Sequence, residues 1–284
     1  MLALVGGAGD ARAAPQGRWV EVRLRAPARL AADRPATGRM LVYVPPGLGK
    51  QPAPLLIVLN GWNGTADEWK RHPEVTAFAD AHGVIVAAPT VGRTVYESRF
   101  YPESRGRWGP VPGAVWLGEV VLPHLRANFP VRRDRAGTAI LGNSTGGRGA
   151  IVVSQRYPQF GFAASLSGTY DLGLLRPTEG EYKIHAVVFG PRARHRQRWV
   201  DEDCVVDARV TPLRAMTLYL AHGGADKVVG VSQLHSMEAF LARHGVQATV
   251  VVDPAAGHDW KFWGAQLRPA VTTLFRALRG APAP

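Results

Sequence analysis

Short apolar runs alternate with helical patterns along most of this chain. Residues 19–25 alternate apolar with charged side chains, and residues 39–45 follow as a second extended segment, so the two predict an antiparallel pair of strands. Later runs are continuously apolar, which is typical of parallel strands covered on both faces. These runs lie at 55–59, 84–87, 138–141, 217–220 and 248–252.

Helical spacing of apolar residues fills the stretches between these runs. A helix over 69–82 is predicted to end at Gly83, and Pro123 is expected to bend a helix over 116–129. Further helices are predicted behind Ser144 and at 233–244, and a final helix includes 267–278. Because strands and helices alternate, we expect an α/β fold with a mostly parallel, doubly wound sheet.

Two long segments, 91–113 and 171–210, show little periodicity. Irregular segments of this length in a compact α/β domain are often functional loops, so we expect them to shape a substrate entrance. The sequence has no linker between two halves and no internal repeat. We therefore predict one domain over 19–280, preceded by a flexible or signal-like segment over 1–18.

Composition and charge narrow the classes of partner. The net charge is +12 over 284 residues, but the arginines that supply most of it are scattered and no nucleic-acid motif accompanies them. We expect no nucleic-acid partner and no transmembrane segment, because no apolar run approaches the ~20 residues needed. The start of the chain resembles a signal with the cleavage pattern Ala11-Arg-Ala13 but lacks a positive beginning. A periplasmic or secreted location is predicted, with a cytoplasmic one as the alternative.

The most informative motif is Gly142-Asn-Ser-Thr-Gly146, which follows an apolar strand and precedes a small-residue helix. This G-x-S-x-G pattern places a serine on a sharp strand-to-helix turn, where bulky neighbours do not fit. The helix N-terminus supplies N–H groups for an oxyanion. Ser144 is the candidate nucleophile; the alternative is a buried or capping serine in an ordinary loop.

A serine nucleophile needs a histidine base and a carboxylate that orients the histidine. Two later strands each end in a loop that carries one of these groups. His222-Gly-Gly-Ala-Asp226 follows one strand, and Asp253-Pro-Ala-Ala-Gly-His258 follows the next. The order Ser, Asp, His is the one used by α/β-hydrolases. We predict Asp226 as the acid and His258 as the base, and we expect His222 to be a packed, hydrogen-bonded residue.

The oxyanion requires two N–H donors, one from the residue after the nucleophile and one from a loop after an early strand. Thr145 supplies the first donor. Leu59-Asn-Gly-Trp62 fits the second loop, with Trp62 as the donor. The single cysteine, Cys204, follows three acidic residues and is a poor nucleophile candidate. No spacing typical of a metal site occurs, and neither a metal nor a cofactor is predicted.

Taken in order, these motifs resemble the putative-esterase branch of the α/β-hydrolase superfamily, which includes esterase D/S-formylglutathione hydrolases, feruloyl esterases, enterochelin esterases and antigen 85 mycolyltransferases. The resemblance runs from about Arg39 to the last helix, and its further motifs are Arg156-Tyr-Pro158, Ser165-Leu-Ser-Gly168 and Gly257-His-Asp-Trp260. It implies an α/β-hydrolase fold with about eight strands, helices on both faces, and a Ser144–Asp226–His258 triad. Asn60 stands where many relatives carry histidine, and Asn143 where a bulkier or charged residue is common.

The predicted function is that of a serine carboxylesterase that forms an acyl-enzyme on Ser144. Two alternatives stay open: an acyltransferase with the same triad, and a non-catalytic binding protein on a hydrolase scaffold. Aromatic residues in or near the long loops point to an aryl, sugar or polymer ester, although they could equally anchor these loops to the core. The substrate-binding candidates are Tyr96, Tyr101, Trp108 and Trp260. The sequence leaves the oligomeric state open.

Overall fold

A single eight-stranded sheet runs through the computed structural model, which describes residues 17–30, 36–90, 92–102 and 111–278. The strands are β1 (Arg18–Arg25), β2 (Thr37–Val44), β3 (Leu55–Leu59), β4 (Ile85–Thr90), β5 (Thr138–Asn143), β6 (Phe162–Leu166), β7 (Thr217–Gly223) and β8 (Thr249–Asp253). Their spatial order is β1-β2-β4-β3-β5-β6-β7-β8. β1 and β2 pair antiparallel, as predicted, and β3 to β8 run parallel.

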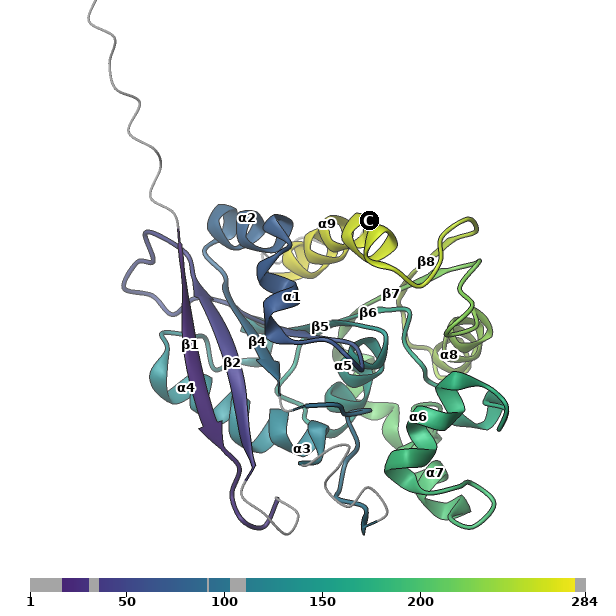
Figure 1. Cartoon of the computed structure of the whole chain (residues 1–284). Helices are drawn as coiled ribbons and strands as arrows, with labels where there is room; N and C mark the ends of the chain where they lie inside the picture. The colour runs from purple at the N-terminus through teal and green to yellow at the C-terminus, as the bar shows by residue number, and fades with distance from the viewer. Residues whose placement is uncertain (1–16, 31–35, 91, 103–110, 279–284) are drawn as a thin grey trace, which may run out of the picture.

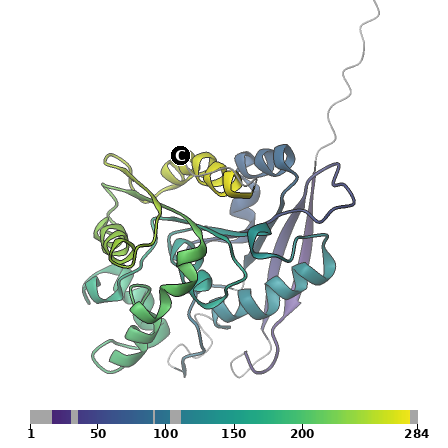
Figure 2. The ribbon, with the colours of Figure 1, turned by 180° about the vertical axis from the view of Figure 1, so that it is seen from behind.

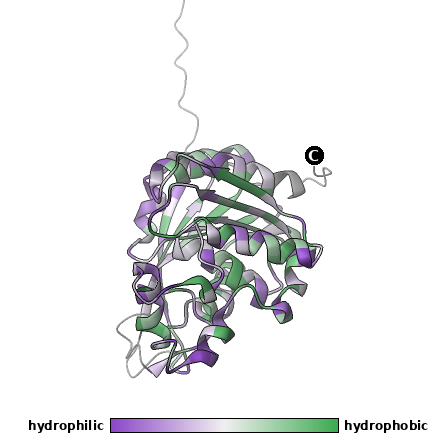
Figure 3. Cartoon of the chain, turned by 90° about the vertical axis from the view of Figure 1, so that its right-hand side faces the viewer, coloured by the Kyte–Doolittle hydropathy of each residue, from purple (hydrophilic) through white to green (hydrophobic). Residues whose placement is uncertain are grey.

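Helices cover both faces of the sheet, as Figures 1 and 2 show from opposite sides. One face packs against α1 (Ala66–Lys70), α2 (Pro73–His82) and α9 (Trp260–Leu278), through a cluster that includes Trp69, Val75 and Phe262. The other face packs against α3 (Gly113–Trp116), α4 (Leu122–Asn128), α5 (Thr145–Arg156) and α8 (Ser232–Arg243). Figure 3 shows the hydrophobic strands between these layers, so the doubly wound architecture predicted from the apolar runs is confirmed.

Two predicted helices are interrupted where a proline enters. The predicted helix over 69–82 is split into α1 and α2, because His72 precedes Pro73 and takes an extended conformation. Gly83 ends α2 at φ 64°, as expected of a left-handed cap. The helix over 116–129 contains a π-helical turn over Leu117–Val121 directly before α4, whose Pro123 lacks the N–H that a regular helix requires.

One strand and two α-helices were not predicted from the pattern. β6 lies between β5 and β7, and its Ala-Ala-Ser centre has little strand propensity. The segment 171–210 contains α6 (Gly180–Phe189) and α7 (Arg196–Glu202). Their aromatic residues pack into a third apolar cluster, which consists of Val95, Tyr101, Leu172, Leu175, Tyr182, Val188, Phe189 and Trp199. In Figure 1, α6 and α7 lie outside the sheet, below and to the right of β6 and β7.

Two predicted features lie in parts of the chain that the structure does not describe. The signal-like segment lies almost wholly outside the described residues, and so does Trp108. In the described part of the chain, no helix combines the length and the apolar character needed to span a membrane.

Candidate active site

Ser144 lies on a strained turn between β5 and α5, the nucleophile elbow. Its φ of 56° and ψ of −125° are unusual for a residue with a side chain and lift it out of the strand direction. The turn is tight on both sides. A Cβ on Gly142 would lie 2.2 Å from the carbonyl oxygen of Gly146, and one on Gly146 would lie 2.3 Å from that of Leu59. Both glycines of the motif are therefore required by close backbone approach.

The tight packing of the elbow predicts that two glycine-to-alanine substitutions change the free energy of unfolding in opposite directions. Gly146→Ala should lower the free energy of unfolding by about 1–3 kcal/mol, because the added methyl group overlaps backbone atoms of the adjacent strand. Gly264→Ala in α9 meets no atom within 4 Å and should raise it by about 0.4–1 kcal/mol. Urea unfolding monitored by tryptophan fluorescence measures both. Equal midpoints for Gly146→Ala and the unmodified protein would contradict the packing argument.

Three polar side chains from separate loops converge at the elbow. His258 Nε2 lies 2.9 Å from Ser144 Oγ, and His258 Nδ1 lies 2.6 Å from Asp226 Oδ2. The loops after β5, β7 and β8 supply these residues, so they meet at the carboxyl edge of the parallel strands. The structure thus brings together Ser144, Asp226 and His258, the residues that the sequence nominated.

The Asp226 carboxylate is held in its charged form. Burial alone would raise its pKa, but the hydrogen bond with His258 and two backbone N–H donors outweigh burial, so the pKa of Asp226 lies below its usual range. The two donors are the amides of Val228 and Val229, 2.8 and 2.9 Å from Oδ1. Asp226 is therefore anionic at neutral pH and fixes the orientation of the imidazole.

His222 lies close to Asp226 but occupies a different role. The side chain is fully buried, and its Nε2 lies 2.9 Å from the carbonyl oxygen of Val229. Burial lowers the pKa of His222, which favours the neutral ring. The expectation that His222 is a packed, hydrogen-bonded residue is confirmed.

The loop after β3 passes directly over the elbow. A Cβ on Gly61 would lie 3.1 Å from Ser144 Cβ, so the backbone before Trp62 approaches the serine closely. Asn60 shapes this loop: its Nδ2 donates to the carbonyl oxygens of Gly61 and Gly64, at 3.0 and 2.7 Å. The asparagine that departs from the family pattern thus holds the turn beside the serine.

A cavity of about 400 Å³ opens beside Ser144 and His258. Its remaining walls combine indole rings, short aliphatic side chains and two carboxylates. Trp62, Asn63, Glu68, Asn143, Glu181, Ile184, Val228, Trp260 and Trp263 contribute these side chains. Trp263 also fixes the imidazole, because its ring meets that of His258 edge-on at 5.0 Å between centroids.

The four substrate-binding candidates have different outcomes. Trp260 lines the cavity, and Trp108 lies outside the described residues. Tyr96 and Tyr101 do not line it, so their expected contact with substrate is wrong for this structure. Tyr96 is buried and donates to the carbonyl oxygen of Asn60, and Tyr101 is buried and donates to Glu202. Both tyrosines anchor loops, which is the alternative that the sequence had left open.

Several cavity residues escaped sequence reasoning. Glu68 lies on α1, and Glu181 and Ile184 lie on α6, a helix that the pattern did not predict. Val228 follows Asp226 by two residues. Its place in the same loop was the one sequence signal that could have identified it as a cavity residue. In segment 171–210, α6 lines the cavity, whereas none of the described residues of 91–113 does.

A buried polar network ties both long segments to the helix that follows Ser144. The fully buried Arg148 donates from Nε to Val95 O at 3.0 Å and from Nη2 to Glu202 O at 2.5 Å. Its Nη1 also lies 3.4 Å from both Thr169 O and Cys204 Sγ. Val95 belongs to one long segment and Glu202 to the other, so one guanidinium joins both to α5.

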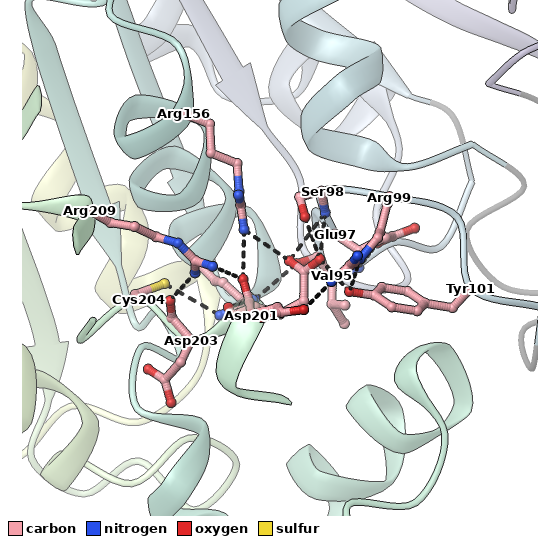
Figure 4. Close-up of polar contacts among 12 residues, drawn as sticks. Val95, Glu97, Ser98, Arg99, Tyr101, Arg156, Asp201, Asp203, Cys204 and Arg209 are labelled. Atoms are coloured by element: carbon pink, nitrogen blue, oxygen red, sulfur yellow. Dashed lines mark hydrogen bonds and ion pairs between the residues drawn. The ribbon is translucent and has the colours of Figure 1, made fainter. Parts of the chain in front are cut away.

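Further arginines surround this network. Figure 4 shows Arg99, Arg156 and Arg209 directed at the segment that contains Asp201. Arg156 donates to Asp201 O at 2.9 Å, and Arg209 donates to the same carbonyl oxygen. These arginine side chains near the third apolar cluster therefore hold loops in place through hydrogen bonds.

Cys204 takes part in this network as a thiol. Burial raises its pKa to about 11, even though the charge of Arg148 opposes this shift. The thiolate that a nucleophile needs is therefore absent at neutral pH. No group of three or more His, Cys, Asp or Glu in the described residues is arranged to hold a metal ion.

Comparisons with known proteins place these features in a family. A family model described as "Putative esterase" matches residues 36–274. The chain is 25% identical over 257 residues to the diacylglycerol acyltransferase/mycolyltransferase Ag85A of Mycobacterium gordonae, covering 81% of this chain and 75% of that protein.

Two solved structures show the same fold. A ferulic acid esterase is similar with a TM-score of 0.70 and 18% identity, over 92% of this chain and 99% of the other. An S-formylglutathione hydrolase from Agrobacterium tumefaciens is similar with a TM-score of 0.72 and 17% identity, over 94% and 98% of the two chains. The α/β-hydrolase fold expected from the resemblance is confirmed.

Proposed function

Because the chain belongs to the putative esterase family and is an ester-hydrolysing enzyme, we propose that it is a serine carboxylesterase whose nucleophile, base and acid are Ser144, His258 and Asp226. The observation that carries the proposal is the continuous hydrogen-bonded path from Asp226 through His258 to Ser144 Oγ, at 2.6 and 2.9 Å. A serine on a strained turn, within reach of an oriented imidazole, has the geometry of an activated nucleophile.

The proposed reaction has two halves. Ser144 Oγ attacks the ester carbonyl carbon while His258 Nε2 takes the hydroxyl proton, and the Asp226 carboxylate stabilises the resulting imidazolium. The backbone N–H groups of Thr145 and Trp62 hold the oxyanion. His258 then returns the proton to the leaving alcohol as the carbon–oxygen bond of the ester breaks. Water, deprotonated by His258, attacks the acyl carbon, and His258 then gives the proton to Ser144 Oγ as the acyl–serine bond breaks, which releases the acid.

A fluorophosphonate probe tests the proposal directly. The probe phosphonylates an activated serine, so we expect one adduct per chain, on the peptide that contains Ser144. Ser167 is an internal comparison, because it also follows a central strand and has a φ of 52° but accepts a hydrogen bond from Trp263 Nε1. An unlabelled protein, or an adduct on the Ser167 peptide, would argue against the assignment.

A second candidate is acyl transfer, in which an alcohol replaces water in the second half. It is favoured by the names of the Ag85 relatives, which describe acyltransferases. The same triad serves both reactions, so only competition by an added alcohol for the acyl-enzyme distinguishes them. Product analysis with a p-nitrophenyl ester and increasing glycerol would show an acyl glycerol in place of free acid if transfer dominates.

A further inference from the structure

The wall of the active-site cavity is acidic in a strongly basic protein. The whole chain carries a net charge of +12, yet Glu68 and Glu181 are the charged side chains among the described residues lining the cavity, apart from the titratable His258. No lysine or arginine within the described ranges joins this wall. A substrate that fills it therefore meets carboxylates and indole rings and no fixed cation.

Glu181 is the unusual member of this wall. Its side chain is only 4% exposed, and its Oε1 accepts a hydrogen bond of 2.5 Å from Thr169 Oγ1. Its other oxygen, Oε2, accepts no hydrogen bond from the part of the chain that the structure describes. Burial raises the pKa of Glu181, in spite of the Thr169 bond and the charge of His258, which lower it. Because Glu181 lines the cavity, this oxygen is open to a donor from the substrate, and a hydrogen bond to a charged group is stronger than one between neutral groups.

The position of Glu181 relative to His258 indicates which part of the substrate it meets. His258 Nε2 must return a proton to the leaving oxygen, so the alcohol part of the ester lies on the His258 side of the cavity. Glu181 and His258 line the same cavity, and the charges of His258, Arg148 and Asp226 all act on the Glu181 carboxyl group. It also borders an adjoining cavity of about 340 Å³, which gives an extended alcohol part additional room.

We propose that Glu181 is a specificity residue, which accepts a hydrogen bond from a donor group on the alcohol part of the ester. This inference rests on the proposed esterase function. The donor is a hydroxyl or an ammonium group, and both satisfy Oε2. An anionic group beside Glu181 and Glu68 is disfavoured, because the wall of the active-site cavity holds these two glutamates and, among the described residues, no lysine or arginine. The cations Arg176 and Lys227 line the adjoining cavity.

Four butyrate esters that differ in the alcohol part test the proposal. Ethyl butyrate has no donor; the 2-hydroxyethyl ester has a hydroxyl; the 2-(dimethylamino)ethyl ester is a protonated ammonium at neutral pH; the 2-carboxyethyl ester is an anion. For the unmodified enzyme we expect kcat/KM of at least one donor ester to exceed that of the ethyl ester by about tenfold, since a site built to bind a donor rejects analogues without it. The carboxylate ester should be the poorest substrate.

Glu181→Gln and Glu238→Gln form the matched pair of variants. Each removes one carboxylate, but Glu238 is exposed on α8, outside the residues that line the cavity. In Glu181→Gln the ratio of kcat/KM for the preferred donor ester to that for the ethyl ester should fall by about tenfold. In Glu238→Gln this ratio should stay within twofold. The glutamine side chain can still accept the Thr169 hydrogen bond, which keeps the local fold.

A solely structural role of Glu181 predicts a different result. If the residue only held Thr169, the substitution would lower kcat/KM equally for all four esters and leave the ratios unchanged, which would overturn the proposal. Equal kcat/KM for the ammonium and carboxylate esters in the unmodified enzyme would also overturn it, even if Glu181→Gln did not fold. Failure of the esterase proposal would look different: none of the esters would be cleaved and a fluorophosphonate would label no serine.

Discussion

Ser144→Ala is expected to lower kcat/KM for p-nitrophenyl acetate by about three to six orders of magnitude. The substitution removes the oxygen that forms the acyl-enzyme while the imidazole and the oxyanion donors stay in place. The remaining rate should come from binding and from stabilisation of the oxyanion. Release of p-nitrophenol, followed under single-turnover and steady-state conditions, measures the loss.

Ser154→Ala is the control for this substitution. Ser154 lies on the same helix, α5, and its hydroxyl is buried and bound to Ala150 O at 2.7 Å. Since it lies outside the cavity lining, its loss should change kcat/KM by no more than about twofold. If Ser144→Ala kept the activity of Ser154→Ala, another residue would have to supply the nucleophile, and the assignment of the triad would be wrong.

Arg148→Met should lower the free energy of unfolding by about 2–5 kcal/mol, because each buried carbonyl oxygen left without a donor costs about 1–3 kcal/mol. Methionine fills most of the space of the arginine stem but cannot donate a hydrogen bond. The carbonyl groups of Val95 and Glu202 would then be buried without the guanidinium. Because these carbonyls belong to the two long segments beside the active site, we also expect faster proteolysis of both segments under native conditions.

Arg268→Met provides the matched control, because Arg268 is exposed on α9. Its replacement should change the free energy of unfolding by less than about 0.5 kcal/mol. Urea titration of both variants gives the comparison, and limited proteolysis with mass spectrometry locates the cleavage sites. A loss below about 1 kcal/mol for Arg148→Met would contradict the prediction. It would show that the hydrogen bonds of the guanidinium barely exceed the free-energy cost of burying it.

The strands of the sheet show where prediction from sequence succeeds. Continuous apolar runs such as 55–59 mark strands that are buried on both faces, and the structure places β3 in the middle of the sheet with five buried residues. The same approach missed β6, whose small residues are buried because the neighbouring strands and helices leave little room. Its burial follows from tertiary packing and is not encoded in local propensity.

The active site shows a similar division. Ser144, Asp226 and His258 were nominated because each follows a strand, and the parallel order of β5, β7 and β8 brings their loops to one edge. Aromatic residues in the long loops carried no such positional signal. Tyr96 and Trp260 were equally plausible from the sequence, but only Trp260 faces the cavity.

The sequence by itself determined the order of most strands and helices, the elbow around Ser144 and the identity of the three polar residues that meet there. These features depend on local chemistry: backbone space for Gly142 and Gly146, apolar character for the strands, and proton transfer for His258. Only the tertiary structure decided which side chains line the cavity. That choice depends on contacts between segments far apart in the chain, such as Arg148 with Glu202, which ties the end of α7 to α5, and Thr169 with Glu181 on α6.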